Sequence, residues 1–384
     1  MIQRTLHIDV LAQKSKYPVL AVTGPRQSGK TTLMKEAFKD YTYLSLENPD
    51  IREYALQDTK GFLKEYNSFV IFDEAQRVPQ LFSYLQDIVD RDKTMGRFIL
   101  SGSQNFHLLH NITQSLSGRV ALFTLFPFDI EEMKKVNILK ENLSEQIFTG
   151  AYPAIYDRDI HPTRYFKDYF DTYIKRDITE LKNIHDMNTF VRFIRICASR
   201  AGQLLNYNDL ARDTGVSHTT CRQWLSLLEA SYIIFMLPPF FNNYSKRIIK
   251  SPKLYFYDTG LLCYLLNYKE NSLSPMERSW GHLFENFIVA EMQKQIAHKN
   301  LFRTLYFWRD SHGNEVDVLF IENGKINIFE IKASTTVSST MFKSLDYFTK
   351  LADPNEVNRY LIYGGDTSQN RSNYAVLPWH TISI

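Results

Sequence analysis

The sequence predicts an α/β protein, with a parallel sheet in its N-terminal part, then a helical segment, then a smaller α/β unit. Three observations support this fold class. The apolar run at residues 18–24 ends in a glycine-rich loop and is followed by a helical pattern. A second apolar run, at residues 69–74, ends in two carboxylates. Near the C-terminus, two runs of alternating apolar residues flank an Asn-Gly pair, which predicts a β-hairpin.

Length and composition place the chain among ordinary multidomain proteins. It has 384 residues, of which 44% are hydrophobic and 23% charged. The motifs below divide it into residues 1–150, 151–273 and 274–384. The net charge of +3 is too small to establish nucleic-acid binding. No run of about 18 apolar residues occurs, and the three cysteines form neither a disulfide framework nor a metal-spaced pair, so we expect no membrane span and a cytoplasmic location.

The glycine-rich loop GPRQSGKT occupies residues 24–31, between the first strand and a helix. In such a loop, successive backbone N–H groups and the N-terminus of the helix form a concave phosphate site. Lys30 would reach the β- and γ-phosphates of ATP, and the Thr31 hydroxyl would coordinate Mg²⁺. The residues expected to bind the nucleotide are Gly24, Pro25, Arg26, Gln27, Ser28, Gly29, Lys30, Thr31 and Thr32.

The second apolar run supplies the two carboxylates that ATP hydrolysis requires. Asp73 would hold the Mg²⁺ through water, and Glu74 would orient the attacking water. A strand that ends in Asp-Glu is, by itself, more often a solvated edge, but its pairing with the loop favours the catalytic interpretation. The next strand, residues 97–103, ends at Ser103, the candidate γ-phosphate sensor, with Asn105 as the second choice. An ordinary exit from strand to loop explains these two residues equally well.

The segments GPRQSGKTTL, FDEAQRVPQL, ILSGSQN, LSGR and LFPFDIEE, in that order, resemble the bacterial and archaeal AAA-type P-loop ATPases fused to a C-terminal domain of unknown function. The resemblance spans nearly the whole chain. It implies a sheet whose central P-loop strand is flanked by the sensor and Walker B strands, with a helical or winged-helix segment behind it. It also implies that Arg119, in LSGR, is an arginine finger that senses a neighbour's nucleotide in a homo-oligomer. The alternative for Arg119 is a surface arginine at the start of a strand.

The middle of the chain has the pattern of a winged helix-turn-helix. A helix through Ala211, a turn at Gly215 and a second helix capped by Ser217 precede the strand-like run YIIFML. In a DNA-binding protein the second helix would enter the groove, and the basic stretch at residues 246–253 would contact phosphates. The groove-facing residues would be His218, Thr219, Arg222 and Gln223. A purely structural role fits the modest basic excess of this segment equally well.

The C-terminal unit carries carboxylates and a lysine at positions that suit metal chemistry. Side chains two apart on a strand share a face, so Glu315 and Asp317 point together, as do Glu330 and Lys332. Asp317 and Glu330 would hold Mg²⁺ or Mn²⁺, and Glu285, on the preceding helix, is a further candidate ligand. Lys332 would orient a water molecule and stabilise developing charge in phosphodiester hydrolysis.

The order of helix, Asp-bearing strand and Glu-x-Lys strand resembles the PD-(D/E)xK, or restriction-endonuclease-like, superfamily. Each element alone is a weak signal, because Glu-x-Lys pairs on exposed strands are common. The chain departs from the fullest form of the motif, since Val316 rather than proline precedes Asp317. That departure counts against cleavage activity. The alternative is a binding or docking module, a role that a nuclease-like fold also serves.

Three functions follow from these motifs. The first is an ATP-regulated nucleic-acid enzyme in which the P-loop and sensor residues report hydrolysis to the C-terminal half. The second is a non-cleaving ATPase switch or scaffold that binds a protein partner. The third is a winged-helix regulator that binds one DNA sequence. Different observations distinguish them: divalent-dependent cleavage indicates the first, partner capture without DNA binding the second, and preference for one duplex sequence the third.

Overall fold

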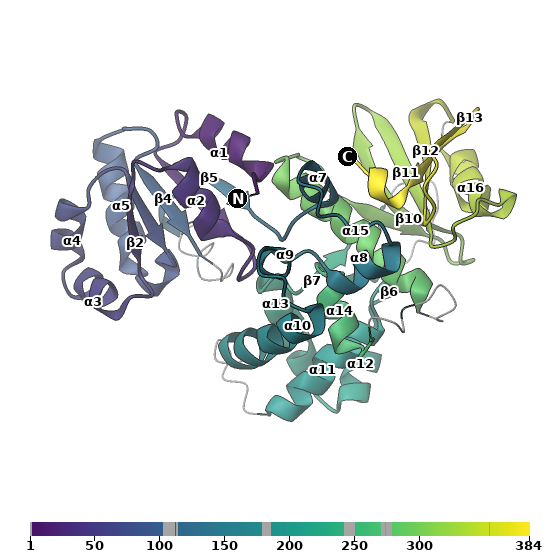
Figure 1. The fold of residues 1–384 in the computed structure, drawn as a ribbon, viewed down its shortest axis with the longest axis horizontal. Coiled ribbons are helices and arrows are strands. Elements are labelled where there is room, and N and C mark those ends of the chain that lie inside the picture. The colour runs from purple at the N-terminus through teal and green to yellow at the C-terminus, as the bar shows by residue number, and fades with distance from the viewer. Residues whose placement is uncertain are drawn as a thin grey trace. The chain divides into compact units, whose positions relative to one another are not determined.

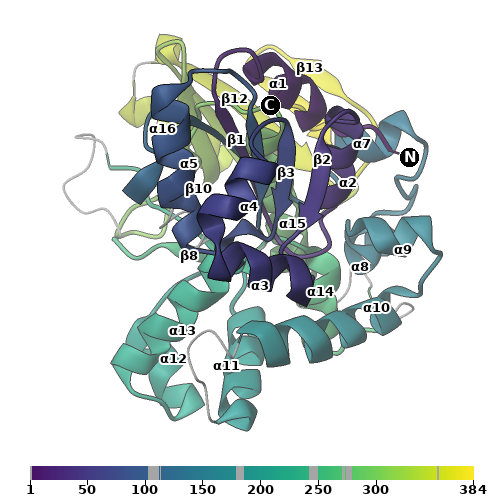
Figure 2. The same ribbon diagram turned by 90° about the vertical axis from the view of Figure 1, so that its left-hand side faces the viewer.

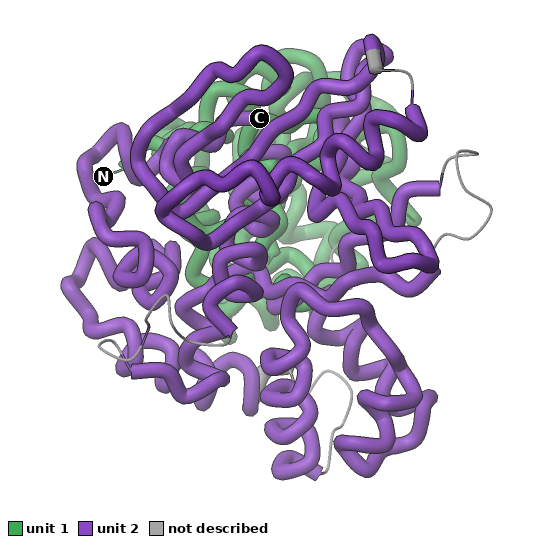
Figure 3. Tube along the Cα trace, turned by 90° about the vertical axis from the view of Figure 1, so that its right-hand side faces the viewer, with its two compact units in different colours: residues 1–128, 230–232, 297–301 green, residues 129–229, 233–296, 302–384 purple. Residues whose placement is uncertain are grey.

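The computed structural model describes residues 2–102, 112, 114–178, 186–241, 250–269, 273, 279–352 and 354–384. The chain divides into two compact units (Figure 3). Unit 1 comprises residues 1–128, 230–232 and 297–301, and unit 2 comprises residues 129–229, 233–296 and 302–384. Among the described residues, no helix is both long and apolar enough to cross a bilayer. The three-part division expected from the motifs stays a prediction.

Unit 1 is built on a five-stranded parallel sheet, which confirms the α/β class predicted for this part of the chain. Its strands are β1 (Val19–Thr23), β2 (Thr42–Ser45), β3 (Val70–Asp73), β4 (Phe98–Ser101) and β5 (Val120–Thr124). Its helices are α1 (Leu6–Gln13), α2 (Lys30–Ala37), α3 (Pro49–Gln57), α4 (Thr59–Glu65) and α5 (Gln80–Arg91), with a 3-10 turn at Ala75–Arg77. Every residue of β1 is buried, so its sequence is a continuous apolar run rather than an alternating one.

Helices cover both faces of this sheet (Figures 1 and 2). Alternate residues of a strand point to opposite faces, so one strand serves two cores. Ala21 of β1 belongs to the cluster that contains Phe62 of α4 and Leu85 of α5. Leu20 belongs to the cluster on the other face, with Leu33 of α2 and residues of α1. The P-loop between β1 and α2 is therefore anchored on both sides of the sheet.

The strand order is β2-β3-β4-β1-β5, which corrects the order implied by the resemblance. β1 lies between β4 and β5, so the P-loop strand and the Walker B strand β3 are not neighbours. The chain crosses from β3 through α5 and returns on the side of β3 that faces β1, which inserts β4 between them. β4, the sensor strand, pairs with both β1 and β3, so its implied place beside the P-loop strand is present.

Unit 1 is completed by two short segments from far along the chain. Tyr232, in the segment 230–232, donates a hydrogen bond from its phenol to Thr23 Oγ1 at 2.9 Å. Its ring meets the Phe126 ring edge-on, with 5.5 Å between centroids. The segment 297–301 contributes His298, whose Nε2 accepts a hydrogen bond from the Phe126 backbone N–H at 3.1 Å.

The first part of unit 2 is mostly helical. Its helices are α7 (Ile130–Lys135), α8 (Leu143–Thr149), α9 (Pro153–Asp157), α10 (Pro162–Tyr169), a π-helix (Phe170–Ile178), α11 (Met187–Ser199), α12 (Tyr207–Thr214), α13 (His218–Ala230) and α14 (Thr259–Leu265). A small antiparallel sheet of order β6-β8-β7 is built from β6 (Gln203–Leu204), β7 (Ile234–Leu237) and β8 (Lys253–Phe256). Prolines begin α9 and α10, where a missing N–H costs no hydrogen bond.

The C-terminal part of unit 2 combines α15 (Trp280–His298) and α16 (Lys343–Leu351) with a six-stranded mixed sheet of order β13-β14-β12-β11-β10-β9. The strands are β9 (Tyr306–Arg309), β10 (Glu315–Glu322), β11 (Lys325–Lys332), β12 (Val357–Tyr363), β13 (Gln369–Arg371) and β14 (Tyr374–Pro378). Short 3-10 turns lie at Ser339–Phe342, Pro354–Glu356 and Trp379–Thr381. Residues of α16 pack on this sheet in one buried cluster with Trp308 and Ile328.

The predicted hairpin is confirmed by the pairing of β10 and β11. The two strands are antiparallel, with Val318 opposite Phe329 and Glu322 opposite Lys325. The connecting residues Asn323 and Gly324 have φ of 50° and 77°, as a two-residue type I′ turn requires. This turn fixes the register, and the register decides which side chains of the two strands share a face.

Candidate functional site

The P-loop follows a backbone path that requires glycine at two positions. Gly24 has a φ of 138°, and a Cβ there would lie 2.1 Å from the carbonyl oxygen of Leu125. Gly29 has a φ of 98° and is the N-cap residue of α2. The loop therefore runs directly into the N-terminus of α2, where unpaired N–H groups and the helix dipole favour an anion.

Lys30 is buried and bonded to the loop itself. Its ammonium donates hydrogen bonds to the carbonyl oxygens of Gly24 at 3.0 Å and Pro25 at 2.8 Å. Burial lowers the pKa of Lys30 to about 8, while the nearby Glu74 and Asp73 carboxylates oppose that shift. A bound phosphate would supply stronger partners for this ammonium than the two carbonyls do.

The other expected nucleotide-binding residues lie at different depths. Ser28 is fully buried, and its Oγ has no hydrogen-bond partner among the described residues. Gln27 has a positive φ of 64°, and Arg26 lies 3.9 Å from Glu47 in an exposed ion pair. Thr32 is exposed on α2. Their contacts to a nucleotide stay predictions.

Arg4, which no sequence pattern marks, braces the P-loop from the N-terminal side. Its guanidinium donates to the carbonyl oxygens of Ser28 at 2.8 Å and Phe126 at 2.6 Å. It also lies 4.9 Å from the centroid of the Phe128 ring and 3.5 Å from His298 Nε2. All of these residues belong to unit 1. A buried, multiply bonded arginine of this kind rigidifies the loop that it contacts.

Asp73 accepts hydrogen bonds from three hydroxyl groups on neighbouring elements. Thr31 Oγ1 donates to Asp73 Oδ2 at 2.9 Å, which brings the two expected magnesium ligands together. The phenol of Tyr43, the second residue of β2, donates to the same oxygen at 2.6 Å, and the hydroxyl of Ser101, the last residue of β4, donates to Oδ1. Sequence reasoning missed Tyr43 and Ser101, because the positions of β2 and β4 on either side of β3 appear only in the folded sheet.

Glu74 has an unusual backbone for a residue with a side chain. Its φ of 55° and ψ of 45° lie in the left-handed region. Gln76 Nε2 donates a hydrogen bond to Glu74 Oε2 at 2.5 Å. The other end of that amide, Gln76 Oε1, is buried and has no partner among the described residues. The Gln76 Oε1 atom is thus a hydrogen-bond acceptor beside the Glu74 carboxylate, which would orient the attacking water.

The roles expected for the candidate sensors, Ser103 and Asn105, and for Arg119 stay predictions. Ser103 and Asn105, the candidate sensors, lie outside the described residues. Arg119, at the start of β5, donates two hydrogen bonds to Asp90, at 2.5 Å from Nε and 2.9 Å from Nη2. Its action on a neighbour's nucleotide stays a prediction, and it would require Arg119 to leave Asp90.

The helix-turn-helix pattern corresponds to α12 and α13. Gly215 ends α12 with a φ of 76°, and Ser217 Oγ accepts a hydrogen bond from the Thr220 N–H at 3.0 Å at the start of α13. The antiparallel strands β7 and β8 come after α13 along the chain. The side chains expected to face a DNA groove are all exposed, namely His218, Thr219, Arg222 and Gln223.

The structure corrects the role expected for Lys253 at the end of the basic stretch. Residues 242–249 lie outside the described part of the chain, and Lys250 is exposed. Lys253 is only 2% exposed and cannot meet a phosphate backbone. Its ammonium donates to Glu285 Oε1 at 2.8 Å and forms an ion pair with Glu315. The sequence pattern hid this burial, because the carboxylates that neutralise Lys253 come from distant segments.

The C-terminal carboxylates converge from α15 and β10. Oxygen atoms of Glu285, Glu315 and Asp317 all lie within 4.8 Å of one another. The Tyr255 phenol, on β8, donates to Glu285 Oε1 at 2.6 Å, and the Ile331 N–H donates to Asp317 Oδ2 at 2.8 Å. Hard oxygen donors at this spacing fit Mg²⁺ or Mn²⁺.

Glu330 and Lys332 lie beside this cluster on β11. The Lys332 ammonium forms an ion pair with Glu330 and lies 3.9 Å from Asp317 Oδ2. The Ser344 hydroxyl donates to Glu330 Oε2 at 2.5 Å. Burial, followed by the Glu330 and Glu285 carboxylates, raises the pKa of Asp317 well above its usual range. Burial lowers the pKa of Lys332, but Asp317 and Glu330 outweigh it, so that pKa lies above its usual value.

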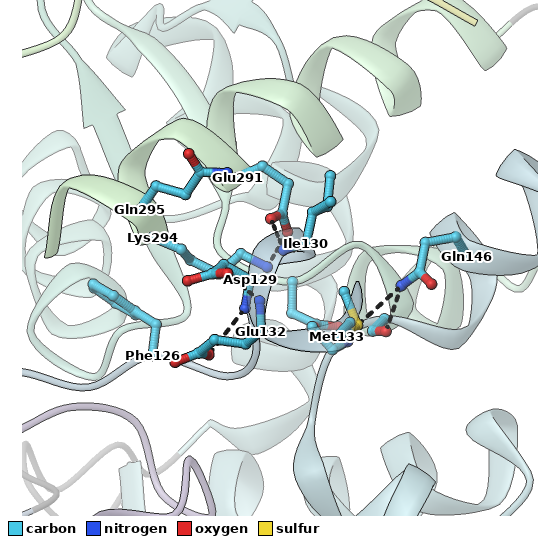
Figure 4. A network of polar contacts seen from close by, with 12 residues as sticks. Phe126, Asp129, Ile130, Glu132, Met133, Gln146, Glu291, Lys294 and Gln295 are labelled. Carbon is cyan, nitrogen blue, oxygen red and sulfur yellow. Dashed lines mark hydrogen bonds and ion pairs between the residues drawn. The ribbon is translucent and has the colours of Figure 1, made fainter. Parts of the chain in front are cut away.

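A buried polar network fixes α15, the helix that carries Glu285 (Figure 4). Glu291 of α15 accepts a hydrogen bond from the Ile130 N–H at 2.8 Å and forms an ion pair with Lys294. The partner helix α7 begins with a capping box, in which Asp129 accepts from the Glu132 N–H at 2.8 Å. Burial raises the pKa of Glu291, and Lys294 opposes that shift.

Three family models match separate parts of the chain. An AAA domain matches residues 16–134, a domain of unknown function (DUF8612) matches residues 140–272, and another (DUF4143) matches residues 280–382. Among solved structures, the Walker-type ATPase PABY2304 of Pyrococcus abyssi is 16% identical with a TM-score of 0.46, over 69% of this chain and 96% of that one. The ORC2 protein of Aeropyrum pernix is 13% identical with a TM-score of 0.32, over 60% and 84%. These scores are low, so the assignment of unit 1 rests on the AAA-domain match and its own geometry.

Two curated proteins are similar over most of the chain. They are the uncharacterized proteins Rv2008c of Mycobacterium tuberculosis and Mb2031c of Mycobacterium bovis. Each is 31% identical over 326 residues, which is 84% of this chain and 71% of the relative. The chain therefore belongs to the family of these two mycobacterial proteins, and its N-terminal part is an AAA-type P-loop ATPase domain.

Proposed function

We propose that the protein hydrolyses ATP at the P-loop and uses the nucleotide state to control a divalent-cation-dependent, nuclease-like site in its C-terminal part. The observation that carries the second half is the convergence of Glu285, Glu315 and Asp317, with oxygens within 4.8 Å of one another. Lys332 lies beside them, 3.9 Å from Asp317. The coupling of the two activities rests on their fusion in one chain.

At the P-loop, each residue has a defined task. Lys30 exchanges the carbonyl oxygens of Gly24 and Pro25 for the β- and γ-phosphates. Thr31 and Asp73, already 2.9 Å apart, would hold Mg²⁺, which neutralises phosphate charge when bound. Glu74 orients the attacking water in line with the γ-phosphate. Ser103 would report the loss of that phosphate, and Arg119 would act only in an oligomer.

In the C-terminal part, Asp317 and Glu285 would hold Mg²⁺ or Mn²⁺ together with Glu315, whose oxygen lies within 4.8 Å of theirs. Glu330, which pairs with Lys332 beside this group, would be a further ligand. The bound ion would act as a Lewis acid on the scissile phosphate. Lys332 holds the water in position and stabilises the charge that develops on the phosphate oxygens. The exposed side chains of α13 would bind DNA, with Arg222 and Gln223 contacting the groove.

The test is cleavage of labelled single- and double-stranded DNA and RNA by the full chain in Mg²⁺ or Mn²⁺, with and without ATP. We expect cleavage that is lost in Glu330→Ala and that responds to ATP in the natural protein but not in Lys30→Ala. The two variants lie in different units, so each serves as the control for the other.

A second candidate function is a non-cleaving ATPase switch that binds a protein partner. It is favoured by Val316, which stands where the fullest nuclease motif has proline. ATP hydrolysis that depends on Lys30, together with no cleavage under any condition, would select this function. Tight binding of one duplex sequence without cleavage would instead select a DNA-binding regulator.

A further inference from the structure

A lysine from outside the C-terminal sheet contacts two carboxylates of the cluster. Lys253 is the first residue of β8, the central strand of the small sheet β6-β8-β7. Its side chain is 3% exposed, and its ammonium contacts Glu285 at 2.8 Å and pairs with Glu315. It thus binds two of the three carboxylates whose oxygens are spaced for a divalent ion.

This position makes Lys253 and a divalent ion competitors. Three carboxylates within a few ångströms repel one another strongly when they are buried, unless a cation lies among them. In this structure the buried Lys253 ammonium contacts both Glu285 and Glu315, while Arg309 pairs with the other oxygen of Glu315 at 2.8 Å and Lys332 lies 3.9 Å from Asp317. A divalent ion would need oxygens of the Glu285 and Glu315 carboxylates, and Lys253 contacts one oxygen of each. Its binding therefore carries the cost of breaking a buried ion pair.

We propose that Lys253 is a built-in cation that keeps the C-terminal site closed to divalent metal, and that metal enters only when β8 withdraws this side chain. The inference rests on the proposed function, because it concerns the same carboxylates. β8 pairs with β7, with Ile234 opposite Phe256, and β7 comes next along the chain after α13. A ligand that displaces these strands would thus open the site.

The first test is Mn²⁺ binding to the full, nucleotide-free chain, measured by calorimetry or by the electron paramagnetic resonance of free Mn²⁺. Lys253→Met keeps most of the side-chain volume and removes the charge. We expect Lys253→Met to bind Mn²⁺ at least about ten-fold more tightly than the natural protein, because no ammonium then competes with the ion for the carboxylates. Lys253→Arg and the exposed control Lys250→Met should bind as the natural protein does. Asp317→Asn supplies the baseline for binding elsewhere in the chain.

The outcomes separate the two proposals. Equal Mn²⁺ affinity in Lys253→Met and the natural protein, with binding lost in Asp317→Asn, would overturn the role of Lys253 and leave the metal site standing. No Mn²⁺ binding above the Asp317→Asn baseline, in either the natural protein or Lys253→Met, would overturn the metal site itself and with it the proposed function.

A second measurement needs no substitution at Lys253 and remains decisive if Lys253→Met fails to fold. Acetic anhydride modifies accessible, uncharged amines, and a buried ion-paired lysine reacts slowly. Mass spectrometry of the natural protein should show several-fold more acetylation of Lys253 in saturating Mn²⁺ than without it. Lys250, which is exposed, should react equally in both. Unchanged acetylation of Lys253 at saturating Mn²⁺ would contradict the proposal.

Discussion

The side-chain amide of Gln76 donates a hydrogen bond to Glu74, with 2.5 Å between Nε2 and Oε2. Glu74 is held in the left-handed backbone region, a conformation that costs about 1–3 kcal/mol for a non-glycine residue. The surrounding contacts must therefore over-determine its position. Gln76 supplies one of those contacts directly to the carboxylate that would orient the attacking water.

Gln76→Ala should lower kcat for ATP hydrolysis about ten-fold while leaving the affinity for ATP within about two-fold, because it disturbs only the orientation of Glu74. Steady-state kinetics and nucleotide titration measure the two quantities. Arg77→Ala is the matched control, since Arg77 contacts Glu47 at the surface instead. A parallel loss of ATP affinity in Gln76→Ala would show that Gln76 supports the loop in general and not the carboxylate.

Tyr43→Phe should raise the Mg²⁺ concentration needed for half-maximal ATPase activity several-fold. The phenol donates to Asp73 Oδ2 at 2.6 Å, and without it the carboxylate loses one of the hydroxyl groups that fix its plane. Magnesium titration at saturating ATP measures the effect. Tyr41→Phe is a suitable control, because Tyr41 lies on the neighbouring chain segment and donates to Gly96 O. An unchanged Mg²⁺ dependence would mean that Thr31 and Ser101 suffice.

ATP binding should take up a proton at about pH 9 and much less near pH 7. Burial lowers the pKa of Lys30 to about 8, so this amine is mostly neutral in the free protein at the higher pH. Phosphate contacts favour its charged form and raise that pKa, so a proton enters with the nucleotide. Calorimetry in buffers of different ionisation enthalpy counts the proton. Lys30→Arg, which stays charged, should show no uptake at either pH.

Lys294→Met should destabilise unit 2 by roughly 3–5 kcal/mol, because it leaves the buried Glu291 carboxylate without its cation. The pKa of Glu291 is raised in the folded state, so the cost of its charged form is absent below the unfolded-state pKa. The loss should therefore grow as the pH rises through the folded-state pKa. Denaturant unfolding at several pH values measures it.

The double variant Lys294→Met/Glu291→Gln should recover part of that stability. The neutral amide can still accept the Ile130 N–H, and it carries no unpaired charge. If the single and double variants are equally unstable at neutral pH, the packing of the lysine stem and not the ion pair would be what holds α15.

Local patterns predicted the elements that local chemistry determines. The P-loop between β1 and α2, and the turn at Asn323 and Gly324, follow from residues adjacent in sequence. The order of the strands did not follow, because the side on which the chain returns after α5 depends on tertiary packing. Of the two neighbours that the resemblance implied for β1, the sensor strand β4 is one and the Walker B strand β3 is not.

The side chains around each site were harder to predict than the motifs. Ser101 and Tyr43 reach Asp73 from strands whose adjacency appears only in the folded sheet. Lys253 stands in a basic stretch that pointed to phosphate contact, yet it is buried against Glu285 and Glu315 from later segments. Pairings between segments far apart in sequence leave no periodic signal along the chain.

Unit 1 is assembled from separate segments of the chain, so it cannot fold completely until residues 297–301 have been synthesised. When the ribosome has released residues 1–128, the strands of the parallel sheet and the P-loop exist, but Tyr232 and His298 have not been synthesised. Thr23 then lacks its phenol partner, and Arg4 and Phe126 lack the imidazole. A nascent chain can thus contain the sheet and the P-loop of unit 1 before the segments that complete the unit have been synthesised. A chain truncated after residue 128 should therefore bind nucleotide more weakly than the full chain does.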